Sequence, residues 1–306
     1  MTRTRAGALA AIALAAVALA GAGRAPAARP PAFDGEAALR HVAALVAIGP
    51  RPAGSPAAAR ARAYIAGELT RAGVEVRLQS FEADTPHGRL PMANVVGVVR
   101  GRRSDVVLIG GHYDTKWFRE IPFVGANDGG SSAALLIELA RRLAAAPREF
   151  TYWTVFFDGE EAREAWTAED SLYGSRRMAE ELRRERRLPR AVIVADMIGD
   201  RNLGIRRETL STPWLTDLLW QTARRLGHGR HFLDDSHTVE DDHAPFLRAG
   251  VPAALLIDFD YPPWHTADDT LDKVSARSLQ VVGEVILGAL PALEARLAGG
   301  EKGTRP

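Results

Sequence analysis

The feature that most constrains the fold is a set of short apolar runs, each with an acidic residue or a histidine close beside it. The runs at 105–111 and 191–195 predict buried strands, and His112 and Asp196 follow them directly. Three further residues of this kind lie near other apolar runs: Asp128, Glu161 and His265. Because imidazole and carboxylate ligands from several strand ends can surround a cation that no single loop could enclose, this arrangement predicts a metal site.

Predicted strands alternate with predicted helices along most of the chain. Strands are expected over 74–81, 93–100, 105–111, 150–157, 191–195 and 251–257. Helices are expected over 37–48, 57–72, 131–145, 171–186, 213–226 and 275–297. Such alternation is typical of a single α/β domain with a mostly parallel, mixed central β-sheet flanked by helices. The metal site is then expected at the carboxyl ends of the strands.

Composition supports an ordinary folded domain and excludes several kinds of site. With 306 residues, of which 46% are hydrophobic, the chain can bury a substantial core. The formal net charge of +1 gives no strongly basic surface, so we expect no nucleic acid partner. Cysteine is absent, which excludes thiol nucleophiles, disulfides and thiolate zinc sites. Metal binding is therefore left to His, Asp and Glu.

The first 28 residues have the composition of a secretory signal peptide. Arg3 and Arg5 precede an alanine-rich apolar stretch at 6–21, and small residues that offer cleavage positions follow it. An uncleaved anchor is the alternative, although the apolar stretch falls short of the roughly 20 residues of a membrane span. We expect a signal peptide at 1–28 and one folded domain at 29–306. The protein is then exported, either periplasmic or secreted, with no other segment that spans a membrane, and we expect a monomer.

Two candidate ligands each have a simpler interpretation. His112 follows two glycines, which let the backbone pass close to a crowded centre, and Asp114 could accept a hydrogen bond from its ring. A lone histidine after a strand is more often packed or solvated. Asp128 lies just before a predicted helix, and aspartate is a good helix N-cap, so a capping role is the alternative for this residue.

The paired carboxylates are harder to explain without a function. Glu160 and Glu161 follow an apolar strand, where adjacent like charges are unfavourable unless a cation or a shared proton offsets them. Neighbours in sequence point in different directions, so one can bind metal while the other acts as general acid and base. Asp196 has apolar neighbours on both sides, and a buried carboxylate there needs a partner.

Taken together, these motifs resemble a known family over nearly the whole mature chain. In order and spacing they resemble the M28 zinc aminopeptidases: Gly49 to Ser55, His112-Tyr113-Asp114, Gly125 to Gly130, Glu160-Glu161, Asp196 and His265. Within that superfamily the chain looks most like the bacterial type of glutaminyl-peptide cyclotransferase, or glutaminyl cyclase. The features that favour this branch are the segment 162–170 with Trp166, the segment 241–248, and Trp264 directly before His265.

The resemblance implies a reaction and a set of residue roles. Asp128, Glu161 and His265 would bind one zinc ion, and the catalytic residues would be Glu160, Asp196 and Asp241. The walls of the substrate pocket would be formed by three aromatic residues: Trp166, Trp264 and Tyr261. The enzyme would act on peptide or protein N-termini, converting N-terminal glutamine to pyroglutamate with release of ammonia. For the tryptophans, plain core packing is the alternative.

Other functions stay open at this point. His112 and Asp196 would complete the ligand set of a two-zinc aminopeptidase, which would use Glu160 to activate water and cleave N-terminal residues. The number of zinc ions is thus one or two. A scaffold domain without activity predicts a lost ligand, and none is lost. The two cysteines that many animal secretory cyclases pair are missing from this chain.

Overall fold

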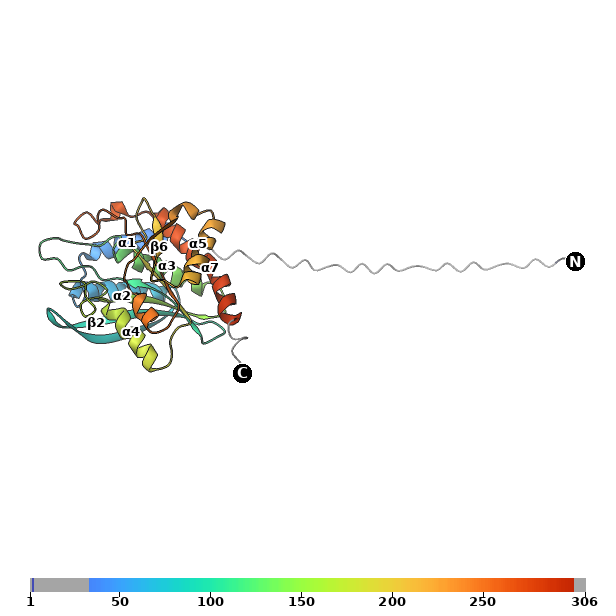
Figure 1. Cartoon of the computed structure of the whole chain (residues 1–306), viewed down its shortest axis with the longest axis horizontal. Helices are drawn as coiled ribbons and strands as arrows, with labels where there is room; N and C mark the ends of the chain where they lie inside the picture. The colour runs from blue at the N-terminus through green and yellow to red at the C-terminus, as the bar shows by residue number, and fades with distance from the viewer. Residues whose placement is uncertain (1, 3–32, 300–306) are drawn as a thin grey trace. The chain divides into compact units, whose positions relative to one another are not determined.

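The computed structural model describes residues 2 and 33–299, which contain a six-stranded mixed β-sheet with helices on both faces (Figure 1). In spatial order its strands are β1 (Glu75–Thr85), β2 (Gly88–Val99), β4 (Thr151–Phe157), β3 (Val106–His112), β5 (Ala191–Asp196) and β8 (Ala253–Ile257). The last four run parallel to one another, whereas β1 and β2 form an antiparallel hairpin at one edge. The predicted α/β domain with a mostly parallel, mixed central sheet is confirmed.

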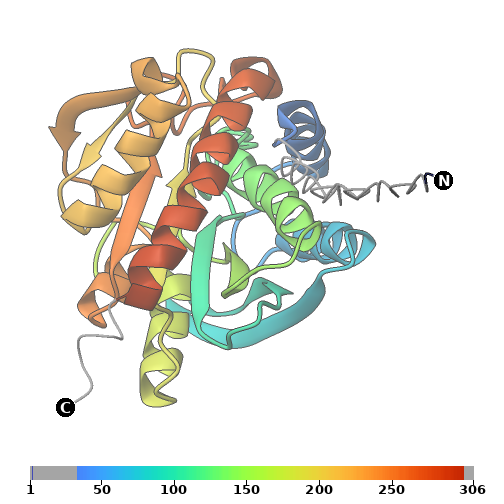
Figure 2. The same cartoon turned by 90° about the vertical axis from the view of Figure 1, so that its right-hand side faces the viewer.

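Helices cover the sheet on both faces. One face packs against α1 (Gly35–Ile48), α2 (Pro56–Arg71), α3 (Gly130–Ala144), α5 (Pro213–Arg225) and α7 (Ala276–Gly299). The other face packs against α4 (Tyr173–Arg184) and the short α6 (Ala244–Arg248). Figure 2 shows α3 (green) and α7 (red) next to each other on the first face. Along β5, Ile193 packs into the first core while Val192 and Val194 pack into the second, as strand alternation requires.

Local sequence sets the starts of α1 and α2 through side chains that cap their first turns. Asp34 caps α1 by accepting a hydrogen bond from the amide of Ala37 at 2.9 Å. Ser55 caps α2 in the same way through the amide of Ala58 at 3.0 Å, and Pro56 occupies the first turn. The segment between the two helices is a loop, and it contains the buried Arg51.

Three short elements were not predicted from the sequence. The strands β6 (Ile205–Glu208) and β7 (Phe232–His237) pair in a small separate sheet, and α6 follows them. Two short 3-10 helices, η1 (Gly229–His231) and η2 (Leu271–Lys273), were not predicted either. Within these residues, no helix combines the length and the apolar character needed to cross a membrane. The signal peptide predicted at 1–28 lies, apart from residue 2, outside the described part of the chain.

Candidate active site

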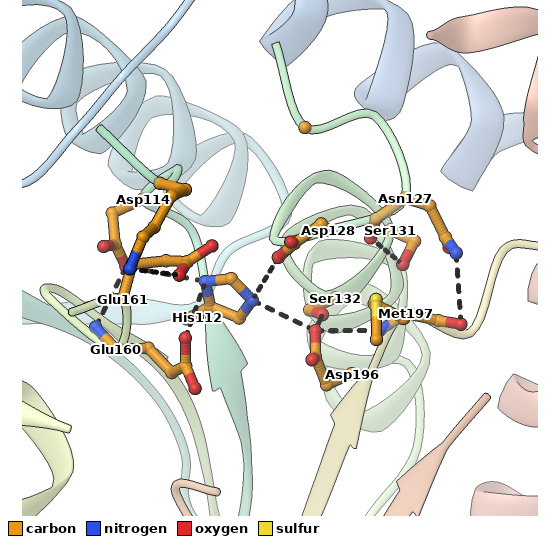
Figure 3. Close-up of polar contacts among 12 residues, drawn as sticks. His112, Asp114, Asn127, Asp128, Ser131, Ser132, Glu160, Glu161, Asp196 and Met197 are labelled. Carbon is orange, nitrogen blue, oxygen red and sulfur yellow. Dashed lines mark hydrogen bonds and ion pairs between the residues drawn. The ribbon is translucent and has the colours of Figure 1, made fainter. Parts of the chain in front are cut away.

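The carboxyl ends of the parallel strands bring the predicted ligands together. His112 is the last residue of β3 and Asp196 is the last residue of β5, while Asp128 precedes α3. Nε2 of His112 lies 3.0 Å from Oδ1 of Asp196 and 3.2 Å from Oδ1 of Asp128. Figure 3 shows the ring of His112 between these two carboxylates on one side and the carboxylates of Asp114 and Glu160 on the other. All of these side chains are buried.

A second group of ligands shares Asp128 with the first. Nε2 of His265 lies 3.4 Å from Oδ2 of Asp128 and 3.1 Å from Oε1 of Glu161. Asp128 therefore turns one carboxylate oxygen toward each histidine. In each triad, one possible ligand atom from every residue lies within 4.8 Å of the others. A carboxylate that faces two such groups is the arrangement that a bridging metal ligand needs.

The chemistry of both triads suits zinc. Imidazole nitrogens and carboxylate oxygens are ordinary zinc ligands. Oδ2 of Asp128 is buried and has no partner in hydrogen-bond geometry within the described residues. Burial raises the pKa of Glu161 to about 7, and the nearby charge of Asp128 adds to this effect. Burial alone would lower the pKa of His265, but the carboxylates of Asp128 and Glu161 beside its ring raise it to about 9. A bound cation would offset this crowding of buried carboxylates.

Asp128 does not act as a helix cap. The N-cap position of α3 is Gly129, and no side chain caps that helix. Gly129 has a φ of +74°, and a side chain there would collide with the backbone of Asp114 and with the ring of His112. The glycine lets the loop bend tightly beside His112, which leaves the carboxylate of Asp128 free to face the two histidines.

The triad of Asp128, Glu161 and His265 opens into a pocket of about 400 Å³, a size typical of sites for small ligands. Three carboxylates that the sequence singled out line the same pocket: Glu160, Asp196 and Asp241. The apolar part of the wall includes Trp166, Phe259 and Trp264, together with Val239 and Ile257. Trp264 stacks on the ring of His265, with ring centroids 4.1 Å apart and planes inclined by 22°.

Comparison with known proteins identifies the family. The sequence pattern of peptidase family M28 matches residues 94–290. A glutaminyl-peptide cyclotransferase of Gloydius blomhoffii is 31% identical over 278 residues, with 76% of each chain covered. A glutaminyl cyclase structure from an Acidobacteriales bacterium is 42% identical, with a TM-score of 0.85, and covers 90% of this chain and 100% of that chain. The chain belongs to the glutaminyl cyclase branch of peptidase family M28.

The same fold also occurs among peptidases. A leucine aminopeptidase precursor from Bacteroides thetaiotaomicron VPI-5482 is 25% identical to this glutaminyl cyclase family member, with a TM-score of 0.79. That match covers 85% of this chain and 98% of that chain. The difference between the two activities must therefore be sought in the pocket rather than in the fold.

Two of the three aromatic residues expected in the wall lie there. Trp166 and Trp264 are 43% and 40% exposed, so neither is a core residue, and both line the pocket of this cyclase family member. Tyr261 is placed differently from the expectation. It is buried and is not among the lining residues, because its hydroxyl donates to Oδ1 of Asp269 at 2.8 Å. Phe259, which was not predicted from the sequence, lines the pocket wall.

Glu160 and Glu161 diverge as expected. The carboxylate of Glu161 faces His265, whereas that of Glu160 lies 4.0 Å from Nδ1 of His112. Burial raises the pKa of Glu160 well above its ordinary value, although the charge of His112 opposes the rise. Burial raises the pKa of Asp241 in the same direction, and the charge of Asp196 adds to it. The pocket of this cyclase family member therefore holds carboxyl groups that keep a proton to higher pH than ordinary Asp and Glu side chains.

Three supporting residues complete the site of this family member. Asp114 lies 3.5 Å from Nδ1 of His112, which is long for the expected hydrogen bond, and its other contact is the amide of Glu160 at 3.2 Å. Lys116 lines the pocket and donates to the carbonyl of Ala162 at 2.6 Å. Neither Lys116 nor Asp269 was predicted from the sequence, although Asp269 lies only four positions after His265.

Proposed function

We propose that this protein is a zinc-dependent glutaminyl-peptide cyclotransferase, which converts the N-terminal glutamine of peptides to pyroglutamate and releases ammonia. The observation that carries the proposal is that Glu160 and the triad of Asp128, Glu161 and His265 line one aromatic-walled pocket. One pocket thus offers a metal-binding triad, a proton carrier and an apolar wall.

The reaction needs one proton carrier at the reacting nitrogen atoms. Asp128, Glu161 and His265 would hold the zinc ion, which would supply Lewis acidity for the side-chain amide of the substrate. Glu160 accepts a proton from the α-amine as that nitrogen bonds to the carbonyl carbon of the side-chain amide (Cδ). It returns the proton to the amide nitrogen, whose bond to Cδ breaks as ammonia leaves. Burial raises the pKa of Glu160, which suits a carboxyl group that accepts a proton in one step and returns it in the next.

The aromatic wall suits a reaction within one substrate molecule. Trp166, Phe259 and Trp264 border the pocket and limit the room for water. Cyclisation consumes no water, so excluding it suppresses hydrolysis without removing a reactant. Asp241 and Asp196 lie in the same pocket, where they would form a hydrogen-bond network around the reacting amide.

We propose one zinc ion rather than two. All three residues of the Asp128, Glu161 and His265 triad line the pocket, whereas His112 does not. Nε2 of His112 lies 3.0 Å from Asp196, whose Oδ1 also accepts from Ser132 at 3.0 Å. His112 and Asp196 then act as a hydrogen-bonded pair beside the metal.

The second triad favours an alternative activity. His112, Asp128 and Asp196 could hold another metal ion, and a two-metal site is what a zinc aminopeptidase requires. In that enzyme Glu160 would activate water and the product would be a free N-terminal amino acid. For either activity we propose a monomer exported by the segment at 1–28 to the periplasm or the medium, with peptide N-termini as substrates and neither nucleic acid nor membrane as a partner.

A direct product assay tests the proposal. Purified, zinc-loaded protein is offered a Gln-initiated and a Leu-initiated peptide, and the products are analysed by mass spectrometry. We expect the Gln peptide to lose the mass of one ammonia while the Leu peptide stays intact. The Glu160→Gln variant, which keeps the shape of the side chain, should lose this activity and still bind zinc. Release of free leucine would instead establish the aminopeptidase.

A further inference from the structure

A buried pair of side chains lies beneath one wall of the pocket and has no part in the proposed chemistry. Nε2 of His243 lies 3.1 Å from Oε2 of Glu208, and both side chains are fully buried. Glu208 is the last residue of β6, and His243 directly precedes α6. A buried ion pair is weak evidence of a stabilising role, so the contacts of Glu208 must show what else the pair does.

Glu208 is satisfied by donors from two segments. Its Oε1 accepts from the amides of Leu210 at 2.8 Å and Val239 at 3.3 Å. Its Oε2 accepts from the amide and the hydroxyl of Ser211, both at 2.8 Å, besides His243. Burial alone would raise the pKa of Glu208, but these hydrogen bonds, that of His243 first, lower it to about 2. The carboxylate is therefore charged and held from several directions.

Glu208 contacts Val239 and His243, which lie at either end of a segment that forms one wall of the pocket. Thr238, Val239, Glu240 and Asp241 all line that pocket. Asp241 lies between the two points at which Glu208 holds this segment. The hydroxyl of Ser211 also accepts from the amide of Leu255 at 3.0 Å, which ties the cluster to strand β8. The segment 238–243 is thus fastened through Glu208 to the central sheet.

His243 takes part as a donor. Its Nδ1 is buried and has no hydrogen-bond partner within the described residues, so the proton of a neutral ring belongs on Nε2, facing Glu208. The ring then fixes the start of α6, two residues beyond Asp241. A shift of this ring would move Asp241 along the pocket wall.

We propose that Glu208 and His243 are positioning residues that hold the segment 238–243, and with it Asp241, in place against the reacting amide. This inference rests on the proposed cyclase function of the same site. Misplacing a catalytic group by about 1 Å can lower a rate by about 100-fold. The pair therefore acts on the reaction through Asp241 without touching the substrate.

The chain contains a matched control. His228 and Glu284 form another largely buried pair, with Nε2 and Oε2 2.7 Å apart. His228 follows α5 and Glu284 lies in α7, and neither lines the pocket. Replacing Glu208 and Glu284 by glutamine, each in its own variant, compares the same chemical change next to the pocket wall and away from it.

The test compares Glu208→Gln with Glu284→Gln in the full-length zinc-loaded protein. We measure kcat and KM on a Gln-initiated peptide, and amide hydrogen exchange across 238–243. Glu208→Gln should lower kcat/KM by about 10- to 100-fold and speed exchange in this segment. Glu284→Gln should change kcat/KM by less than about twofold, even if the variant melts at a lower temperature. It should leave hydrogen exchange across 238–243 unchanged. His243→Gln carries the same test if Glu208→Gln does not fold.

The outcomes separate the two proposals. Unchanged kcat/KM and unchanged exchange in Glu208→Gln or His243→Gln would overturn the positioning role, as would equal kinetic losses in Glu284→Gln. A wild-type protein that does not cyclise Gln peptides would overturn the proposed function. In that case hydrogen exchange alone still decides whether Glu208 holds the segment.

Discussion

Oδ2 of Asp269 accepts a hydrogen bond from the backbone amide of Asp128 at 3.0 Å. Its Oδ1 accepts from the neighbouring amide of Asn127 at 2.8 Å and from the hydroxyl of Tyr261 at 2.8 Å. One carboxylate thus fixes the backbone of the residue that both triads share. Because the direction of the Asp128 side chain depends on this backbone, Asp269 supports the metal site without being a ligand.

Replacing Asp269 should therefore weaken zinc binding. We expect Asp269→Asn to raise the dissociation constant for zinc by about 10- to 100-fold, because one amide of the Asp128 loop would lose its acceptor. Competition with a chromophoric chelator measures this constant. Asp258→Asn is the control, since Asp258 is also buried but accepts from the amides of Gly204 and Asp260. Equal zinc affinity in both variants would contradict the assignment.

Zinc should stabilise the folded protein strongly. The pocket contains several buried carboxylates, and a cation offsets their mutual repulsion. At a free zinc concentration of about 1,000 times the dissociation constant, we expect about 4 kcal/mol of added stability. Thermal melts with and without a chelator measure the shift. His265→Ala should lose it, whereas His87→Ala, which changes a histidine of the β1–β2 turn, should keep it. A full shift in His265→Ala would refute the proposed ligand set.

Removal of Trp264 should impair catalysis more than folding. Its ring stacks on His265 and is 40% exposed outside the hydrophobic core, so truncation frees the imidazole and widens the pocket without opening a cavity in the core. We expect Trp264→Ala to lower kcat/KM by about 10-fold, which corresponds to about 1.4 kcal/mol. Steady-state kinetics on a Gln-initiated peptide measure the effect. Trp214→Ala changes a half-buried tryptophan of α5 that contacts Arg296 and does not line the pocket, so it should leave kcat/KM unchanged. Similar losses in both variants would argue against a pocket role.

The sequence predicts the sheet well because its strands are short, apolar and buried. It fails at β6 and β7, where polar residues such as Asp234 and Asp235 are exposed and leave no apolar alternation to detect. Most of the candidate ligands could be anticipated because they lie at a recognisable strand end or glycine-rich turn, whereas His265 lies eight residues beyond the end of β8. The contacts of Asp269 and Glu208 with distant amides could not be anticipated, since they arise only when separate loops meet. Tyr261 was expected in the pocket wall but is buried, because its hydroxyl donates to Asp269, eight residues further along the same loop.

The stability of the protein should depend on Glu208 in a particular acid range. The pKa of this carboxyl falls from 4.5 to about 2 on folding, so its ionised form stabilises the native state above pH 4.5, and this contribution is lost as the pH falls toward 2. The shift corresponds to about 3 kcal/mol at pH 5, of which about half should remain at pH 3. His243 and His237 are the titratable neighbours. Burial lowers the pKa of His237, and both histidines are present in the wild type and in the variant alike.

Urea unfolding of wild type and Glu208→Gln at these two pH values measures the effect. The advantage of wild type over the variant should shrink by about half between pH 5 and pH 3, because glutamine has no charge to lose. A difference that stays constant would mean that the pKa of Glu208 does not change on folding. The hydrogen bonds from Val239 and His243 would then not favour the charged carboxylate, and the firm hold on the segment that carries Asp241 would need another source.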